Sequence, residues 1–109
     1  MATRVLIGLA ASAGKYVGRA FLSRQLSEVP TDAIEVLVIH SAGVEWLEAI
    51  LRSSAVVTEV GGKTSHAATI CREFGKPCVT AVTGVMSQLE NGSLISVNGD
   101  SGEVTILPS

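Results

Sequence analysis

The sequence predicts an α/β fold with a βαβαβ centre and strand-rich ends, the last of which is a C-terminal β-hairpin. Short apolar runs rich in β-branched residues, typical of strands buried on both faces, alternate in the centre with amphipathic segments of helical period. Near the C-terminus, two apolar stretches, 94–97 and 104–107, flank a turn-forming segment, 98–102. Helical connections favour right-handed crossovers and parallel strands in the centre, whereas the strands at both ends are predicted to be antiparallel.

The N-terminal third is predicted to be mainly extended. Val5 to Leu9 is predicted to be a buried first strand, residues 11–14 a turn, and residues 16–22 a second extended segment broken by Gly18. Segment 23–33 is polar, contains a proline and is predicted to be a loop. The first residues also imitate a secretory signal with an Ala-x-Ala pattern, but one positive charge and a very short apolar run are weak evidence for secretion.

The central elements are predicted by their period. Residues 36–39, 55–57 and 78–81 are apolar runs predicted to be buried strands. Segments 45–52 and 65–74 place apolar side chains at helical spacing and are predicted to be amphipathic helices.

The second of these helices is well delimited. Thr64 or Ser65 can cap its N-terminus, Gly75 can take the left-handed position after its end, and Pro77 prevents its continuation. After it, residues 85–89 are predicted to form a short helix or turn.

Length and composition predict one domain over residues 1–109, because a chain of 109 residues with 47% hydrophobic content can bury a core without disulfides or metal. A mean hydropathy of +0.44 argues against disorder. The formal charge of −2 and the scattered basic residues give no footprint for nucleic acid or an anionic membrane. No apolar stretch approaches the ~20 residues of a membrane span.

Two cysteines are too few for a disulfide framework, and we interpret Cys71 and Cys78 as reduced core residues of a cytoplasmic protein. A zinc site formed by these cysteines with His40 and His66 is not expected, because Cys71 belongs to an apolar helix stripe and Cys78 to a buried strand. No metal site is predicted.

Residues 61–68, Gly-Gly-Lys-Thr-Ser-His-Ala-Ala, carry the chemistry. They offer a glycine loop whose amides can approach an anion, two hydroxyls, and His66 in the first turn of a helix, where the helix dipole favours negative charge and a neutral imidazole. A neutral histidine is a nucleophile, and its phosphorylated form is an anion that the same groups stabilise. From physics alone, a generic anion site or a histidine that merely caps or packs remains as open as a catalytic one.

Residues 61–68, continued by residues 70–79, closely resemble the signature of the phosphohistidine, or swivelling, domain of phosphoenolpyruvate-utilising enzymes. This family includes pyruvate phosphate dikinase, phosphoenolpyruvate synthase and Enzyme I of the sugar phosphotransferase system. The resemblance extends over nearly the whole chain and implies a three-layer β/β/α swivelling fold. It also implies that His66 is the phosphoryl carrier, that Thr64 orients its imidazole, and that the phosphate-binding loop consists of Gly61, Gly62 and Ser65.

Two segments depart from the family pattern. Residues 42–45 replace a Thr-x-Pro-Asp-like turn, so the surface that faces a partner module is expected to differ. Ala81 stands where a glycine is usual. Neither departure touches the sequence Thr64-Ser65-His66.

The resemblance implies a component of a phosphotransferase rather than a complete enzyme. The domain itself is expected to bind no cofactor. ATP, magnesium and phosphoenolpyruvate or pyruvate are expected on an ATP-binding (ATP-grasp) module and a phosphoenolpyruvate/pyruvate barrel, in other chains or in a longer parent protein. The alternative is a non-catalytic interaction or anion-binding module with the same fold.

Two further residues have no predicted role in the chemistry. His40 ends the strand 36–39 near the sheet edge where α/β sites gather, and is interpreted as an ordinary loop-proximal residue. Arg72 lies six residues after His66, about 240° around the helix, and is interpreted as a solvated or partner-facing charge.

Overall fold

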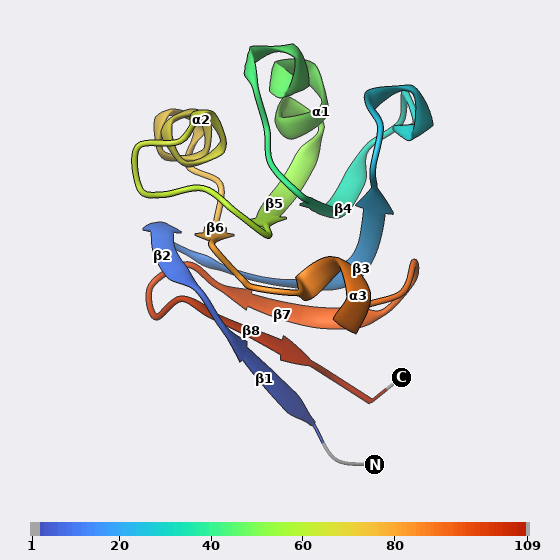
Figure 1. The fold of residues 1–109 in the computed structure, drawn as a ribbon, viewed down its shortest axis with the longest axis vertical. Helices are drawn as coiled ribbons and strands as arrows, with labels where there is room; N and C mark the ends of the chain where they lie inside the picture. The colour runs from blue at the N-terminus through green and yellow to red at the C-terminus, as the bar shows by residue number, and fades with distance from the viewer. Residues whose placement is uncertain (1–2, 109) are drawn as a thin grey trace.

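The computed structural model describes residues 3–108, which form three layers. Helices α1 and α2 cover one face of the parallel strands β4, β5 and β6, and strands β7, β8 and β1 lie on the other face (Figure 1). The strands are β1 (Arg4–Ile7), β2 (Leu9–Ser12), β3 (Lys15–Ser23), β4 (Ile34–Ile39), β5 (Ser53–Thr58), β6 (Cys78–Thr80), β7 (Leu94–Asn98) and β8 (Glu103–Ile106). The α-helices are α1 (Leu47–Leu51), α2 (His66–Phe74) and α3 (Val85–Gln88), and the 3-10 turns are η1 (Leu26–Glu28) and η2 (Val44–Trp46).

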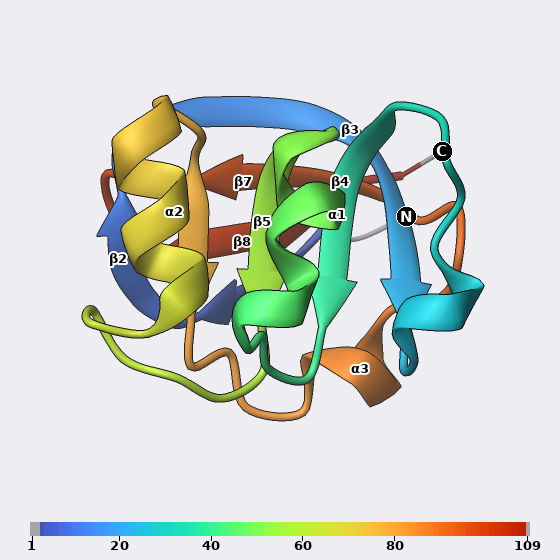
Figure 2. The same cartoon turned by 90° about the horizontal axis from the view of Figure 1, so that it is seen from above.

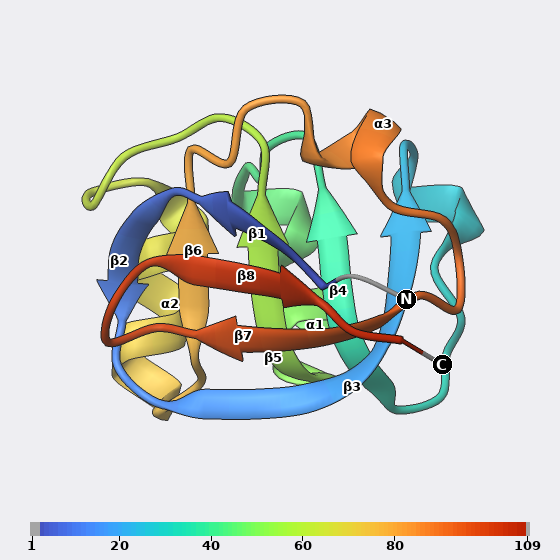
Figure 3. The same cartoon turned by 90° about the horizontal axis from the view of Figure 1, so that it is seen from below.

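The strands are hydrogen-bonded in the order β1-β8-β7-β3-β4-β5-β6-β2. Strands β3 to β6 pair in parallel, and every other pair is antiparallel. The long strand β3 belongs to both sheets, since its first half pairs with β7 and its second half with β4; Figure 3 shows it curving from one layer to the other. The structure therefore confirms the predicted α/β class, the three layers, the βαβαβ centre and the C-terminal hairpin.

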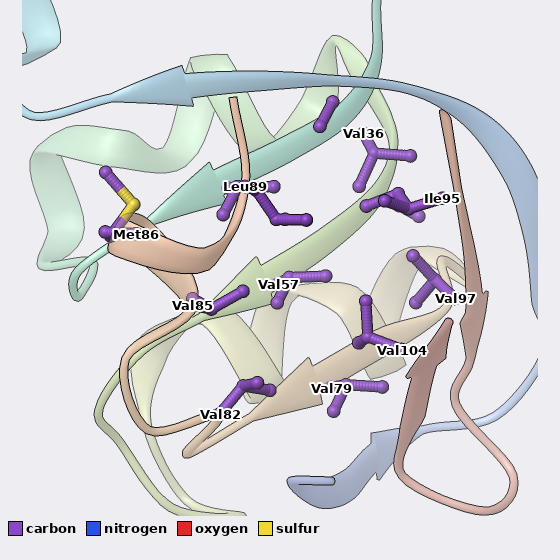
Figure 4. Close-up of a cluster of buried hydrophobic side chains, with 13 residues drawn as sticks. Val36, Val57, Val79, Val82, Val85, Met86, Leu89, Ile95, Val97 and Val104 are labelled. Atoms are coloured by element: carbon purple, nitrogen blue, oxygen red, sulfur yellow. The ribbon is translucent and has the colours of Figure 1, made fainter. Parts of the chain in front are cut away.

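The parallel strands separate two hydrophobic cores, which explains their continuous apolar runs. In β4, Val36 and Val38 pack between the two sheets, and Leu37 and Ile39 pack against the helices; all four side chains are fully buried. Figure 4 shows the core between the sheets, where Val57 and Val79 meet the side chains of β7 and β8. Full burial of side chains of this size contributes about 1.5–3 kcal/mol each.

The prediction of one buried strand over residues 5–9 is wrong. Gly8 divides this segment into β1, which pairs with β8, and β2, which pairs with β6. A Cβ atom at Gly8 would lie 2.4 Å from the Thr80 carbonyl oxygen, so the chain can turn here only without a side chain. Strand β1 also lies at the surface, where Ile7 is 64% exposed.

Three other predictions need correction. Gly18 does not break the second extended segment, because β3 runs through it; the missing side chain leaves room for Glu35, which accepts a hydrogen bond from the Arg19 amide at 2.7 Å. The predicted helix 45–52 consists of the 3-10 turn η2 followed by α1. The predicted loop 23–33 contains the 3-10 turn η1.

Candidate functional site

The loop between β5 and α2 is shaped by one of its two glycines. Gly61 has a φ of +123°, which side chains rarely adopt, and a Cβ there would lie 3.3 Å from the Ser65 side chain. Gly62 has an ordinary φ and open space around it, so its conformation does not require glycine. Its carbonyl oxygen accepts hydrogen bonds from the Ser65 amide at 3.2 Å and the Ser65 hydroxyl at 2.8 Å. The loop is thus tied down immediately before the helix.

Ser65, rather than Thr64, is the N-cap of α2. The Ser65 backbone is extended, and its Oγ accepts a hydrogen bond from the Ala68 amide at 3.4 Å. Gly75 ends the helix with a φ of +68°, as predicted. Thr64 is exposed, and its hydroxyl has no hydrogen-bond partner within residues 3–108. Of the two residues predicted as possible caps, Ser65 is therefore the cap and Thr64 is not, while the role of Thr64 beside the imidazole stays a prediction.

His66 is the first residue of α2, is exposed, and lines a groove of about 440 Å³. Figure 2 shows that α1 and α2 begin at the edge where β4, β5 and β6 end, so the start of α1 forms the wall opposite His66. The groove is lined by Val44, Leu47, Thr64, His66, Thr69 and Ile70. Its walls are apolar apart from two hydroxyls and the imidazole.

The five residues predicted to form the site are contiguous but have different geometries. His66 and Thr64 line the groove. The hydroxyl of Ser65 already donates its proton to the Gly62 carbonyl and accepts from the Ala68 amide. It therefore has no proton left to donate to a ligand. In the first turn of α2, the amides of His66 and Ala67 have no partner among the described residues; Ala67 is buried, so the amide of the exposed His66 is the one that an anion could reach.

Sequence reasoning missed the partner of His40. Its Nδ1 lies 2.8 Å from Oε1 of Glu59, and Oε2 of Glu59 accepts a hydrogen bond from the Met86 amide at 3.1 Å. The hydrogen bond to His40, followed by that to Met86, lowers the pKa of Glu59. Both residues directly follow the ends of paired strands, and this adjacency was the signal that could have linked them.

The remaining candidate residues are structural. Arg72 is not merely solvated, because its guanidinium donates to the Ala11 carbonyl oxygen at 2.8 Å and ties α2 to β2. Cys71 and Cys78 are free and buried, as predicted; their mutual hydrogen bond and burial raise the pKa of the Cys78 thiol. Within residues 3–108, no cluster of His, Cys, Asp or Glu could hold a metal ion, and no helix is long and apolar enough to cross a membrane.

Comparison with known proteins identifies the family. Residues 31–102 match the family described as "PEP-utilising enzyme, mobile domain". The chain belongs to this family. The match contains the glycine loop and His66, and it confirms the resemblance found in the sequence.

The relatives that this chain matches are much longer than the chain itself. The chain is 36% identical over 103 residues to a phosphoenolpyruvate synthase of Pyrococcus furiosus, covering 92% of this chain and 12% of that protein. It is 35% identical over 102 residues to a rifampicin phosphotransferase of Streptomyces sviceus, covering 94% and 12%. An NMR structure of an Enzyme I protein superposes with a TM-score of 0.63 at 26% identity, covering 74% of this chain and 34% of that one. In these relatives, most of the protein lies outside the matched domain.

Proposed function

We propose that His66 is transiently phosphorylated and carries a phosphoryl group between two active sites on other modules. The observation that carries this proposal is the exposed imidazole at the start of a capped helix, beside a groove and two unpartnered amides. Membership of the mobile-domain family and similarity to two phosphotransfer enzymes support it. The donor and acceptor modules would be an ATP-grasp module and a phosphoenolpyruvate/pyruvate or other acceptor module, and ATP, magnesium and phosphoenolpyruvate would bind there.

The chemistry assigned to His66 is a displacement at phosphorus. A ring nitrogen of the neutral imidazole attacks the donor's phosphorus, an N–P bond forms, and the P–O bond to the leaving group breaks with its electron pair on that oxygen. The reverse displacement passes the phosphoryl group to the acceptor. The free amides and the positive end of the α2 dipole favour the negative charge that His66 acquires.

The chain is thus proposed to be one component of a phosphotransferase that works in the cytoplasm, where its two thiols stay reduced. The relatives are about eight times as long as this chain, so the other modules could belong to the same protein. Supplying the phosphoryl group would require those modules, whether in the same chain or in separate proteins.

Intact-mass analysis of protein purified from its native host tests this proposal. We expect a phosphoryl group that is stable in base and lost in acid on the wild type and on His40→Ala, but not on His66→Ala. Alanine is an excellent helix former and position 66 is exposed, so His66→Ala should remain folded. His40→Ala is the matched control, since it removes the chain's other histidine.

A phosphoryl group on His66→Ala would show that His66 is not the carrier. A wild type that never carries phosphate, in cells where its relatives do, would favour the non-catalytic anion-binding or interaction module instead.

A further inference from the structure

The polar lining of the groove beside His66 includes a hydroxyl that the proposed carrier function has not used. Of the six residues that line the groove, three carry polar side chains: His66, Thr64 and Thr69. The other three are Val44, Leu47 and Ile70. Thr69 therefore places one of the two hydroxyls in an otherwise apolar wall.

Thr69 lies three residues after His66 on α2, a spacing that puts both side chains on the same face of the helix. Its backbone amide bonds to the Ser65 carbonyl oxygen at 3.0 Å, as a helical residue should. Its side chain is exposed and its hydroxyl has no hydrogen-bond partner among residues 3–108. A threonine in a helix interior is a relatively poor helix former, so local helix stability does not explain its presence.

The other hydroxyls of this region are already engaged. Ser65 Oγ bonds to the Gly62 carbonyl and to the Ala68 amide, and Thr58 Oγ1 donates to the Val60 carbonyl at 2.9 Å. Only the hydroxyls of Thr64 and Thr69 remain free on the groove wall beside the imidazole.

We propose that Thr69 is a positioning residue: its hydroxyl donates a hydrogen bond to the phosphoryl group on His66, with Thr64 donating from the loop side. This inference rests on the proposed carrier function. A phosphoryl group presents three acceptor oxygens, and neutral hydroxyls can orient it without the strong charge pairing that would hinder its release.

A phosphorus NMR titration of chemically phosphorylated protein tests the role of Thr69. Potassium phosphoramidate serves as the phosphoryl donor, in a His40→Gln background so that one histidine gives the signal. The phosphorus shift of a phosphohistidine follows protonation of the ring nitrogen that carries no phosphoryl group. A hydrogen bond donated to the phosphoryl oxygens offsets the negative charge that favours the imidazolium form and so lowers the pKa of that nitrogen. Thr69→Val should therefore raise the midpoint of the phosphorus shift titration by about half a pH unit, a roughly threefold change.

Two further variants make this result specific. Thr69→Ser keeps the hydroxyl and should restore the wild-type midpoint. Thr83→Val is the matched control, because Thr83 is an exposed threonine that does not line the groove, and it should change nothing.

The proposal is overturned if Thr69→Val titrates like the wild type, or if Thr69→Ser titrates like Thr69→Val. Phosphoramidate loads an accessible histidine whether or not a cell uses it, so either result would leave the carrier function of His66 standing. If phosphoramidate does not phosphorylate His66 at all, the carrier proposal fails first, and the role of Thr69 fails with it.

Discussion

Replacing Ser65 with alanine should destabilise the protein, whereas replacing its neighbour Thr64 with valine should not. Ser65 Oγ accepts from the Ala68 amide at 3.4 Å and donates to the Gly62 carbonyl at 2.8 Å. Loss of an N-cap serine typically costs about 1 kcal/mol, and the long distance to Ala68 puts this cap in the lower half of the usual range. The second, shorter hydrogen bond adds about 0.5–1 kcal/mol, so the total is about 1.5 kcal/mol.

Thr64 has no such contacts, so Thr64→Val should change the free energy of unfolding by less than about 0.5 kcal/mol. Urea denaturation measures both values, and a loss of about 1.5 kcal/mol corresponds to a fall in Tm of about 6–7 °C at this chain length. Ser87→Ala is the matched control, because the Ser87 hydroxyl bonds an exposed carbonyl of Gly84 without capping a helix. If Thr64→Val cost as much as Ser65→Ala, the cap would have been assigned to the wrong residue.

Three further predictions concern the scaffold and its pH dependence. Gly8→Ala forces a methyl group to within 2.4 Å of the Thr80 carbonyl oxygen and should cost about 2 kcal/mol or more by urea denaturation; a cost near zero would mean that the bend relaxes freely. Ala81 has a φ of +57°, so Ala81→Gly should raise Tm, with a gain of up to about 1 kcal/mol, and a loss would count against strain at this position. The pKa of Glu59 is lowered by His40, so its contribution to stability is present above the unfolded pKa and is lost as the pH falls through the folded one. The stability difference between wild type and Glu59→Gln should therefore narrow on acidification below about pH 4.3, and a constant difference in urea titrations would contradict this.

The sequence predicted those elements whose local pattern of apolar residues, or whose end residues, match the way they pack in the fold. Strand β4 was predictable because both of its faces are buried, which demands a continuous apolar run. Helix α2 was predictable because Gly75 and Pro77 mark its end whatever surrounds it. The division of residues 4–12 into two strands was not predictable, because it depends on the close approach of Gly8 to Thr80, 72 positions later in the chain.

Which of Thr64 and Ser65 caps α2 also depends on the three-dimensional structure. Thr64 and Ser65 are equivalent candidates for a cap by residue type, and the Gly61 conformation that turns Ser65 toward Gly62 decides between them. The same sequence correctly predicted the glycine loop and the position of His66 at the helix start. His40 and Glu59 each closely follow a predicted strand, which could have suggested that they lie close together, but their pairing also requires the register of β4 and β5, which single-sequence patterns do not provide.

The position of the groove follows from the topology of the centre. Because β4, β5 and β6 are parallel and joined through α1 and α2, both helices run the same way and begin at the same sheet edge (Figure 2). The start of α1 consequently faces the start of α2, and Val44 and Leu47 border His66 although they lie about twenty positions before it in the chain. Segment 42–45, where this chain departs from the family pattern, therefore reaches the surroundings of His66. Changes in that segment can alter what approaches His66 without altering the loop that holds it.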